Sequence, residues 1–213
     1  MKSLNEYIIE KILINKSSKF INKKIKVESK DQLQSIIKER YNNYNSFLDL
    51  TDIDISELKY LSRIFKRLNN LEVVDISSWN TSNVIYMNDM FLECENIKKI
   101  IGIENLDVSK LEDATSMFSH CEKLVELDLT NWNPILLKNA WNMFSCCSNL
   151  KNIKNIENWQ LPNIKDVSYM FYKCTKLDVD LSNWDLTNIK DDFLKAGIVD
   201  GSGITENHYR KLT

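Results

Sequence analysis

The residues of this chain best able to bind a metal ion or form a disulfide are its five cysteines. Four of them recur at steps of 27, 26 and 27 residues: Cys94, Cys121, Cys147 and Cys174. Such a column could ligate a metal or form disulfides, but no C-x-x-C spacing is present. Leu68 occupies the same place in an earlier, weaker copy, and leucine cannot ligate a metal. We therefore predict a ladder of buried cysteines, with no cofactor and no metal site.

Catalysis has little material in this sequence. Cys146 falls outside the column and is expected to point outward, open to oxidation, but its neighbourhood offers no base that would activate a thiolate. Histidine occurs only as His120 and His208, and no glycine-rich phosphate-binding motif is present. The sequence predicts that the protein is not an enzyme and has no catalytic residues. An enzyme that uses Cys146 and His120 is the alternative.

Four tryptophans recur in a column of their own: Trp79, Trp132, Trp159 and Trp184. A row of tryptophans could stack on sugars or bases. Leu106 and Ile53 take the corresponding places in other copies, which favours a core or rim stack. Trp141 lies outside the repeat pattern, so an exposed Trp141 would be a plausible anchor for a binding partner.

An internal repeat of about 26 residues must position these columns. The pair Met-Phe begins at residues 90, 117, 143 and 170, and each Phe stands three residues before a cysteine of the column. Leu124-Val-Glu-Leu127-Asp-Leu129 has the spacing of a short strand, and Leu71 to Ile76 matches it. Val84, Met87, Met90 and Phe91 predict one face of a helix, and Ser109 with Glu112 predicts the capping box of the next one. Each unit is therefore expected to be turn, helix, turn and short strand, and stacking buries the apolar faces.

Copies differ in length and in quality. Two copies carry one extra residue, at Ile100 to Ile103 and at Ile153 to Ile156, which predicts a bulge between strand and turn. A weaker copy lies upstream at Ile64-Phe65. The downstream copy that starts at Asp180 is expected to fail, because Lys195-Ala196 replace Met-Phe and no cysteine follows. Degenerate end copies suit a stacked array, whose terminal units face water.

The motif resembles that of the BspA-like leucine-rich-repeat family. Trp79 to Val84, Met87, Met90-Phe91 and Cys94 match the family form W-[DN]-x-S-N-V-x-x-M-x-x-M-F-x-x-C, and residues 24–193 are covered. The resemblance implies an α/β leucine-rich-repeat solenoid, with short parallel strands on one face, helices on the other, and an α-helical N-terminal cap. It also implies surface or secreted bacterial proteins used in adhesion and protein binding, with relatives in bacteriophage genomes. Single motif positions are lost at Leu106, Pro134 and Trp141.

The chain divides into four predicted parts. Residues 1–22 form an N-terminal helix, with Ser3 and Glu6 as its capping box, that packs on the first coil or docks another protein. Residues 23–47 supply a strand at 24–27 and a helix at 31–41. Residues 48–196 hold five to six repeat units of 25–27 residues. Residues 197–213 form a C-terminal tail or cap, with a last helical piece around Thr205 to Lys211.

Exposed strand positions are where we expect a protein partner to bind. The predicted partner-binding residues are Glu72, Val73, Lys98, Lys99, Val125, Glu126, Trp141, Lys151, Asn152 and Asp178. Asp75, Asp128 and Asp180 recur at strand ends, where a turn role is the simpler interpretation and a cation-binding acidic cluster the alternative. The predicted function is a non-enzymatic protein-interaction module, in adhesion or host and phage interaction. The alternative is a structural, virion or cell-envelope subunit that self-assembles as a homo-oligomer through its ends or N-terminal helix.

Charge and hydropathy narrow the partners further. Net charge is −2, with +5 in residues 1–45 and −7 in the rest, so the acidic repeat region is not expected to bind nucleic acid. No stretch has the roughly 18 apolar residues of a membrane span. The charged N-terminus lacks the apolar core of a signal peptide, which favours a cytoplasmic or phage-associated location over classical secretion.

Overall fold

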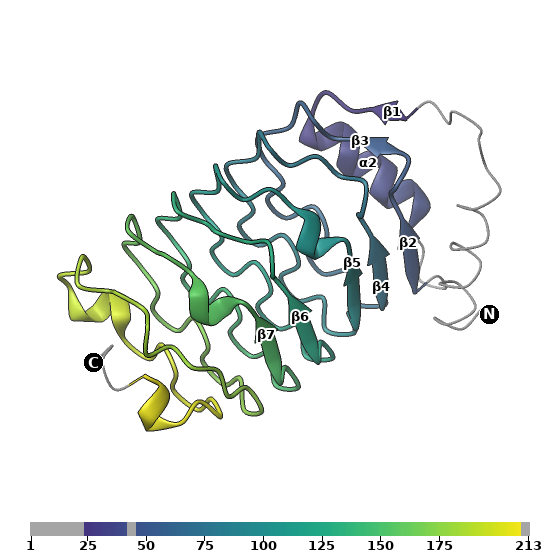
Figure 1. The fold of residues 1–213 in the computed structure, drawn as a ribbon. Coiled ribbons are helices and arrows are strands. Elements are labelled where there is room, and N and C mark those ends of the chain that lie inside the picture. The colour runs from purple at the N-terminus through teal and green to yellow at the C-terminus, as the bar shows by residue number, and fades with distance from the viewer. Residues whose placement is uncertain (1–23, 42–45, 210–213) are drawn as a thin grey trace.

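The repeat units follow one another as coils along a single axis. The computed structural model describes residues 24–41 and 46–209, and Figure 1 shows the coils running from helix α2 at one end to the C-terminal turns at the other. Its short parallel strands and few helices make it an α/β repeat fold. The predicted helix at residues 1–22 lies outside the described residues.

The regular elements are short, and most residues lie in turns. In chain order they are β1 (Ile25–Lys26), α2 (Lys30–Arg40), β2 (Phe47–Asp49), β3 (Ile53–Asp54), β4 (Val73–Asp75), β5 (Lys99–Ile101), the 3-10 turn η1 (Ile103–Asn105), β6 (Glu126–Asp128), β7 (Asn152–Lys154), and the 3-10 turns η2 (Ile156–Asn158), η3 (Asp192–Lys195) and η4 (Glu206–His208).

Parallel strands line one wall of the stack in separate groups. β2, β4 and β5 form one sheet, β6 and β7 form another, and β1 pairs with β3. Equivalent repeat positions meet in register, as Val74 opposite Ile100 and Leu127 opposite Ile153. Strands β5 and β6 follow each other in the stack but do not pair. The wall is therefore interrupted between them.

A column of phenylalanine rings forms the centre of the core. Ring centroids of Phe65, Phe91, Phe118, Phe144 and Phe171 lie 4.8 to 5.7 Å apart from coil to coil, with nearly parallel planes. All five side chains are fully buried. Burying rings of this size in a continuous column supplies the apolar contact that one 26-residue unit cannot make alone.

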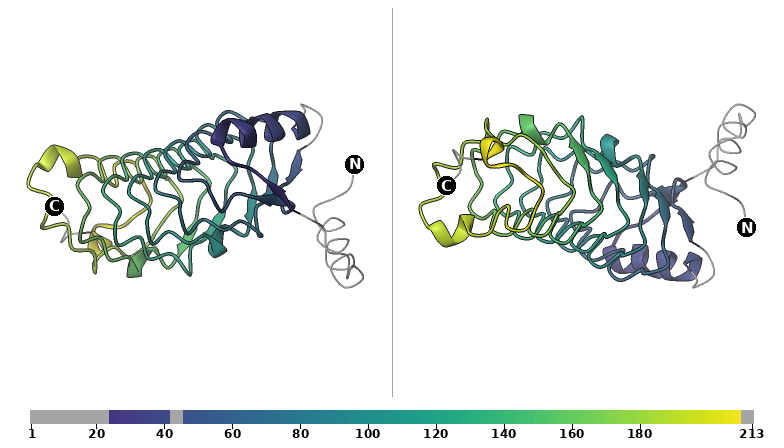
Figure 2. Two further views of the ribbon diagram at one scale, coloured as in Figure 1. Left: turned by 90° about the horizontal axis from the view of Figure 1, so that it is seen from above. Right: turned by 90° about the horizontal axis from the view of Figure 1, so that it is seen from below.

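The wall opposite the strands is built from turns, so the prediction of one helix in each repeat unit is wrong. This turn wall comprises residues 60–67, 86–93, 113–120, 139–146 and 166–173, and its coils are crowded together on one side of the molecule in Figure 2. Overlapping turns close locally, with Met90 N–H donating to Met87 O and Cys94 N–H to Phe91 O. The buried residues keep a helix-like spacing because each turn advances about as many residues as a helical turn. Ser109 N–H donates to the Asp107 carboxylate, so the predicted capping box is also absent.

Residues with left-handed backbone conformation prevent a helix in this segment and give a ladder of backbone hydrogen bonds between neighbouring coils. Asp89 and Glu93 have φ values of 58° and 60°, and every later coil repeats the pair. Each left-handed residue turns its N–H out of the coil, and alternate residues then donate to the next coil. Phe91 N–H, for example, donates to Met117 O at 2.8 Å and Phe118 N–H to Met143 O at 2.8 Å. Isolated parallel bridges extend this ladder from Tyr60 through Tyr86, Asp113 and Asn139 to Asp166.

The extra residue of the longer coils forms a 3-10 turn in place of the expected bulge. Gly102 and Asn155 have φ values of 89° and 73° and directly precede η1 and η2. A Cβ at Gly102 would lie 2.2 Å from Ser77 Cα, so glycine is required there by both space and conformation. Ile103 and Ile156, the first residues of the two turns, point into the core.

The first and last coils differ from the rest. In the first, α2 replaces the turn wall. The Ser29 hydroxyl caps it by accepting from Gln32 N–H, while Leu33 and Ile37 are buried. At the other end the repeat continues beyond the expected break at Lys195-Ala196, because Phe171 N–H donates to Ile198 O. Ile198 therefore holds in the last coil the position that Met170 holds in the coil before it. Gly197 and Gly201 take the left-handed positions that other residues hold in earlier coils.

The tryptophan column is part of the core, and its indole groups tie coils together. Trp79, Trp132 and Trp184 donate Nε1–H to Leu50 O, Ile103 O and Ile156 O of the preceding coil. Trp159 is equally buried, but its Nε1 has no acceptor among the described residues. The equivalent carbonyl, that of Leu129, accepts from the Asn155 side chain instead.

The turn wall predicts an effect of glycine at its left-handed positions. His120 is exposed and has a φ of 60°. Both His120→Gly and His120→Ala remove the imidazole, but only glycine adopts this conformation without a Cβ penalty. We expect the glycine variant to be more stable than the alanine variant by about 1 kcal/mol, measured by urea denaturation. Equal stabilities would show that the ladder does not strain this residue.

The two stacked tryptophans form a matched pair for a second prediction. Trp132 and Trp159 are 1% and 2% exposed, and their rings stack at 6.1 Å. Replacing either by phenylalanine leaves a similar cavity, but only Trp132→Phe removes a hydrogen bond. We expect Trp132→Phe to cost about 1 kcal/mol more than Trp159→Phe in urea denaturation. The reverse order would contradict the assigned role of the indole hydrogen bonds.

Candidate functional site

The strand wall presents a row of polar side chains to solvent. We call Glu72, Val73, Lys98, Lys99, Val125, Glu126, Lys151 and Asn152 the sheet face, because they lie on or just before β4 to β7. Lys98, Lys99, Val125, Glu126, Lys151 and Asn152 are exposed and Glu72 is half-buried. Val73 is only 6% exposed, so the prediction that it is an exposed strand position is wrong. Val73 pairs with Phe47 on one side and Lys99 on the other, and these neighbours enclose it.

Some charges of this wall are committed to each other. Lys98 Nζ lies 2.9 Å from Glu72, and Lys154 Nζ lies 2.7 Å from Asp128, each pair bridging adjacent coils. Lys154, together with the Thr130 hydroxyl, lowers the pKa of Asp128 to about 2. Lys99, Glu126 and Lys151 form no ion pair with another described residue. These three charges are therefore available to a partner.

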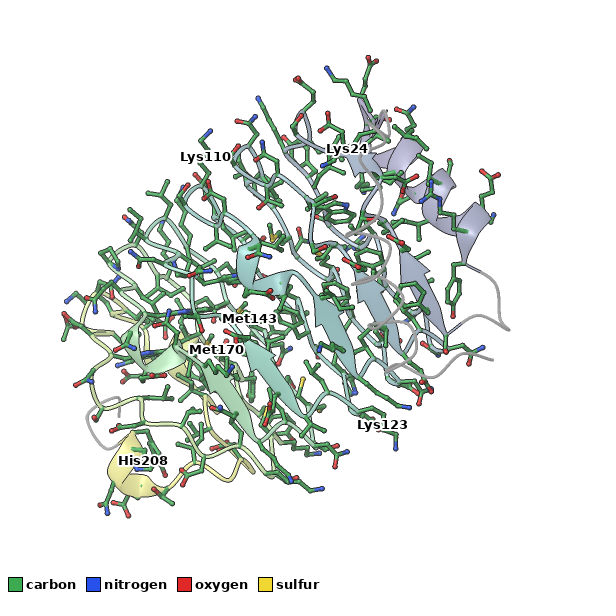
Figure 3. The ribbon with its side chains drawn as sticks, turned by 45° about the vertical axis from the view of Figure 1, so that its right-hand side comes forward. Lys24, Lys110, Lys123, Met143, Met170 and His208 are labelled. Atoms are coloured by element: carbon green, nitrogen blue, oxygen red, sulfur yellow. The ribbon has the colours of Figure 1, made fainter. Side chains whose placement is uncertain are left out.

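Asp178 is engaged by the C-terminal segment. Its carboxylate accepts from Thr205 N–H and lies 2.9 Å from His208 Nδ1. Leu181 N–H donates to His208 O in the same region, and Figure 3 shows His208 at the C-terminal end of the stack. Asp178 therefore holds the last turn in place. Unlike the charges of Lys99, Glu126 and Lys151, its charge is already used within the protein.

Trp141 lies on the turn wall, away from the other predicted binding residues. It is 42% exposed, and its carbonyl accepts from Ser116 N–H in the ladder. Tyr169 in the next coil is 41% exposed and packs edge-on against Tyr172. The predicted binding residues are thus divided between two walls.

The four repeated cysteines are aligned and buried. Each thiol donates to the phenylalanine carbonyl of the preceding coil, for example Cys94 Sγ to Phe65 O at 2.9 Å and Cys147 Sγ to Phe118 O at 3.0 Å. All are free thiols, and all are fully buried. Burial raises the pKa of Cys94 and of Cys174 to about 12, and it raises the pKa of Cys121 and Cys147 strongly as well. A neutral thiol that bonds a carbonyl is a packing group, as the sequence predicted.

Cys146 lies in a turn, and the recurring aspartates Asp75 and Asp128 lie at strand ends. Cys146 is half-buried at a left-handed turn position, with the Ser145 hydroxyl 3.6 Å from its sulfur. Asp75 and Asp128 accept from the backbone N–H two residues later, as turn-forming aspartates do. Within residues 24–41 and 46–209, no group of three or more His, Cys, Asp or Glu residues is arranged to hold a metal ion.

The interruption of the strand wall is a feature that the sequence predictions missed. A pocket of about 560 Å³ lies between β5 and β6, lined by residues 98–104, residues 125–128 and Lys154. The extra residue at Gly102 was its signal, since it lies directly after β5.

The family model described as "Mycoplasma protein of unknown function, DUF285" matches residues 32–153 and 97–196. A crystal structure of a leucine-rich repeat protein from Eubacterium ventriosum is similar with a TM-score of 0.47 and 14% identity, covering 76% of this chain and 44% of that one. This chain thus spans less than half the length of that protein. None of the curated proteins matches the chain. Among the helices that the structure describes, none has both the length and the apolarity to cross a membrane.

The cysteine ladder predicts that stability falls at alkaline pH. An unfolded thiol ionises near its ordinary pKa of 9.0, whereas Cys94 stays neutral in the fold up to about 12. Its contribution is therefore complete below pH 9 and is lost as pH rises toward 12. Between pH 7 and 10 we expect the stability advantage of the wild type over Cys94→Ala to shrink by about 1 kcal/mol in urea denaturation. A constant difference would show that the thiol ionises in the folded protein.

Proposed function

We propose that this chain, which belongs to the DUF285 family of Mycoplasma proteins, is a non-enzymatic protein-interaction module. The observation that carries the proposal is the sheet face, where exposed side chains stand on a backbone fixed from coil to coil by strand pairing. A preorganised surface loses little conformational entropy on binding, so a few side chains suffice for affinity.

The available charges indicate the character of the partner surface. Lys99, Glu126 and Lys151 carry both signs and stand near the apolar Val125, which is 42% exposed. A mixed polar surface around an apolar contact is typical of non-obligate protein interfaces. An adhesion role, a phage-related role and self-assembly as a structural subunit stay predictions made from the sequence. The leucine-rich-repeat solenoid architecture is also a prediction made from the sequence.

Charge reversal on the sheet face tests the proposal. We expect Lys99→Glu with Lys151→Glu to lose a protein retained by the wild type, because neither lysine has an ion pair to break with residues 24–41 or 46–209. The control reverses Lys110 and Lys165, which are exposed away from the strands, and Figure 3 shows Lys110 at the edge opposite Lys123. Retention is measured by affinity capture and quantified by mass spectrometry. Equal retention by both double variants, or none by the wild type, would overturn the proposal.

A further inference from the structure

The geometry points to the slot between β5 and β6 as a binding site for one extended peptide segment, which would pair its main chain with the open strand edges. We call this feature the β5–β6 slot, defined by residues 98–104 and 125–128. The inference deepens the proposed protein-interaction function and rests on it.

The strand edges that face the slot carry unpaired main-chain groups. Lys99 N–H donates to Glu72 O and Ile101 O accepts from Ile76 N–H, so these two residues face β4. Neighbouring residues of a strand point their N–H and C=O groups to opposite sides. The main-chain groups of Ile100 therefore face β6, and they have no backbone partner among the described residues.

The opposite edge has the same character. Val125 O accepts from Lys151 N–H and Leu129 N–H donates to Lys154 O, so these positions face β7. The N–H and C=O groups of Glu126 and Asp128 consequently face β5. Neither residue has a backbone hydrogen bond across the slot within the described part of the chain, since β5 and β6 do not pair. Two edges with alternating donors and acceptors match the main chain of an extended peptide.

The slot is closed at both ends by bonds between the coils. At one end Lys123 N–H donates to Glu95 O at 3.1 Å. At the other, Trp132 Nε1–H donates to Ile103 O and the Asn131 side chain donates to Glu104 O. The opening is therefore confined to the strand residues themselves. The hydrogen bonds on either side of it hold the two coils together.

Charge indicates which side chains the peptide would carry. Lys99 and Glu126 occupy the same repeat position on facing strands but form no ion pair across the slot. Equivalent cross-coil pairs nearby close to 2.9 Å at Glu72 and Lys98, and to 2.7 Å at Asp128 and Lys154. Both charges are therefore left for a bound peptide. The slot offers a basic rim on β5 and an acidic rim on β6 to a peptide that bears one acidic and one basic side chain.

The experiment uses the full chain and a defined peptide. The probe is a capped, fluorescent heptapeptide with valines on its inner face and one glutamate and one lysine on its outer face. We expect saturable binding by fluorescence anisotropy and, by NMR hydrogen exchange, roughly tenfold or greater slowing at the amides of Ile100, Glu126 and Asp128. The Leu127 amide, which faces β7, should exchange slowly with and without the peptide.

Two controls separate main-chain pairing from other contacts. The same peptide with alternate backbone N-methyl groups keeps its side chains but loses donors, so it should not bind. Glu126→Pro removes an N–H that faces the slot and should abolish binding, whereas Glu126→Ala keeps that N–H and loses only the carboxylate of the acidic rim, so it should weaken binding without abolishing it. If Glu126→Pro does not fold, the methylated peptide and the exchange pattern still test main-chain pairing with the wild-type protein.

Several results would overturn the inference. These are no binding at millimolar peptide, equal binding of the methylated peptide, slow exchange of the three amides in the free protein, or protection confined to the turn wall. Slow exchange would mean that the slot is closed. Any of them combined with partner loss in the Lys99→Glu, Lys151→Glu variant would leave the proposed function intact and reject only the slot.

Discussion

Hydrogen bonds between turns of neighbouring coils are the constraint on which the rest of the molecule depends. In a helix each N–H is used within its own segment. Here a left-handed residue at every fourth position of the turn wall directs alternate N–H groups to the next coil, as Phe91 does to Met117. The bond fixes the coil spacing, and this spacing brings the phenylalanine rings to 4.8 to 5.7 Å. The aromatic column and the cysteine ladder follow from that distance.

The same spacing explains why chemically capable residues are structural. A thiol placed beside the carbonyl of the preceding coil donates a hydrogen bond and stays neutral, as Cys94 does to Phe65. Indoles at the tryptophan positions donate in the same way, and Leu106 is tolerated because a leucine there leaves no donor unpaired. The proposed binding function therefore uses side chains of the sheet face that the stack does not use.

Much of the core was predictable from spacing, since recurrence of Met-Phe and cysteine identifies columns without any structure. The turn wall was not, because its buried residues have the i, i+3, i+4, i+7 spacing of a helix. Only the left-handed φ of residues such as Asp89 separates the two, and residues as different as Cys146 and Tyr169 hold the same places in other coils, so no residue type marks them. Repeat position predicted exposure for Lys99 and Glu126, but at Val73 the neighbouring strands decided otherwise.

The alternation of long and short coils changes what counts as one building block. Gly102 with Ile103-Glu104-Asn105 and Asn155 with Ile156-Glu157-Asn158 perform the same turn, and positions 102 and 155 are 53 residues apart. Strand β6 pairs with β7 within such a doublet, whereas β5, in the long coil before it, does not pair with β6. The translational period of this architecture is thus two coils. Arrays of different length that conserve every register would therefore differ by whole doublets.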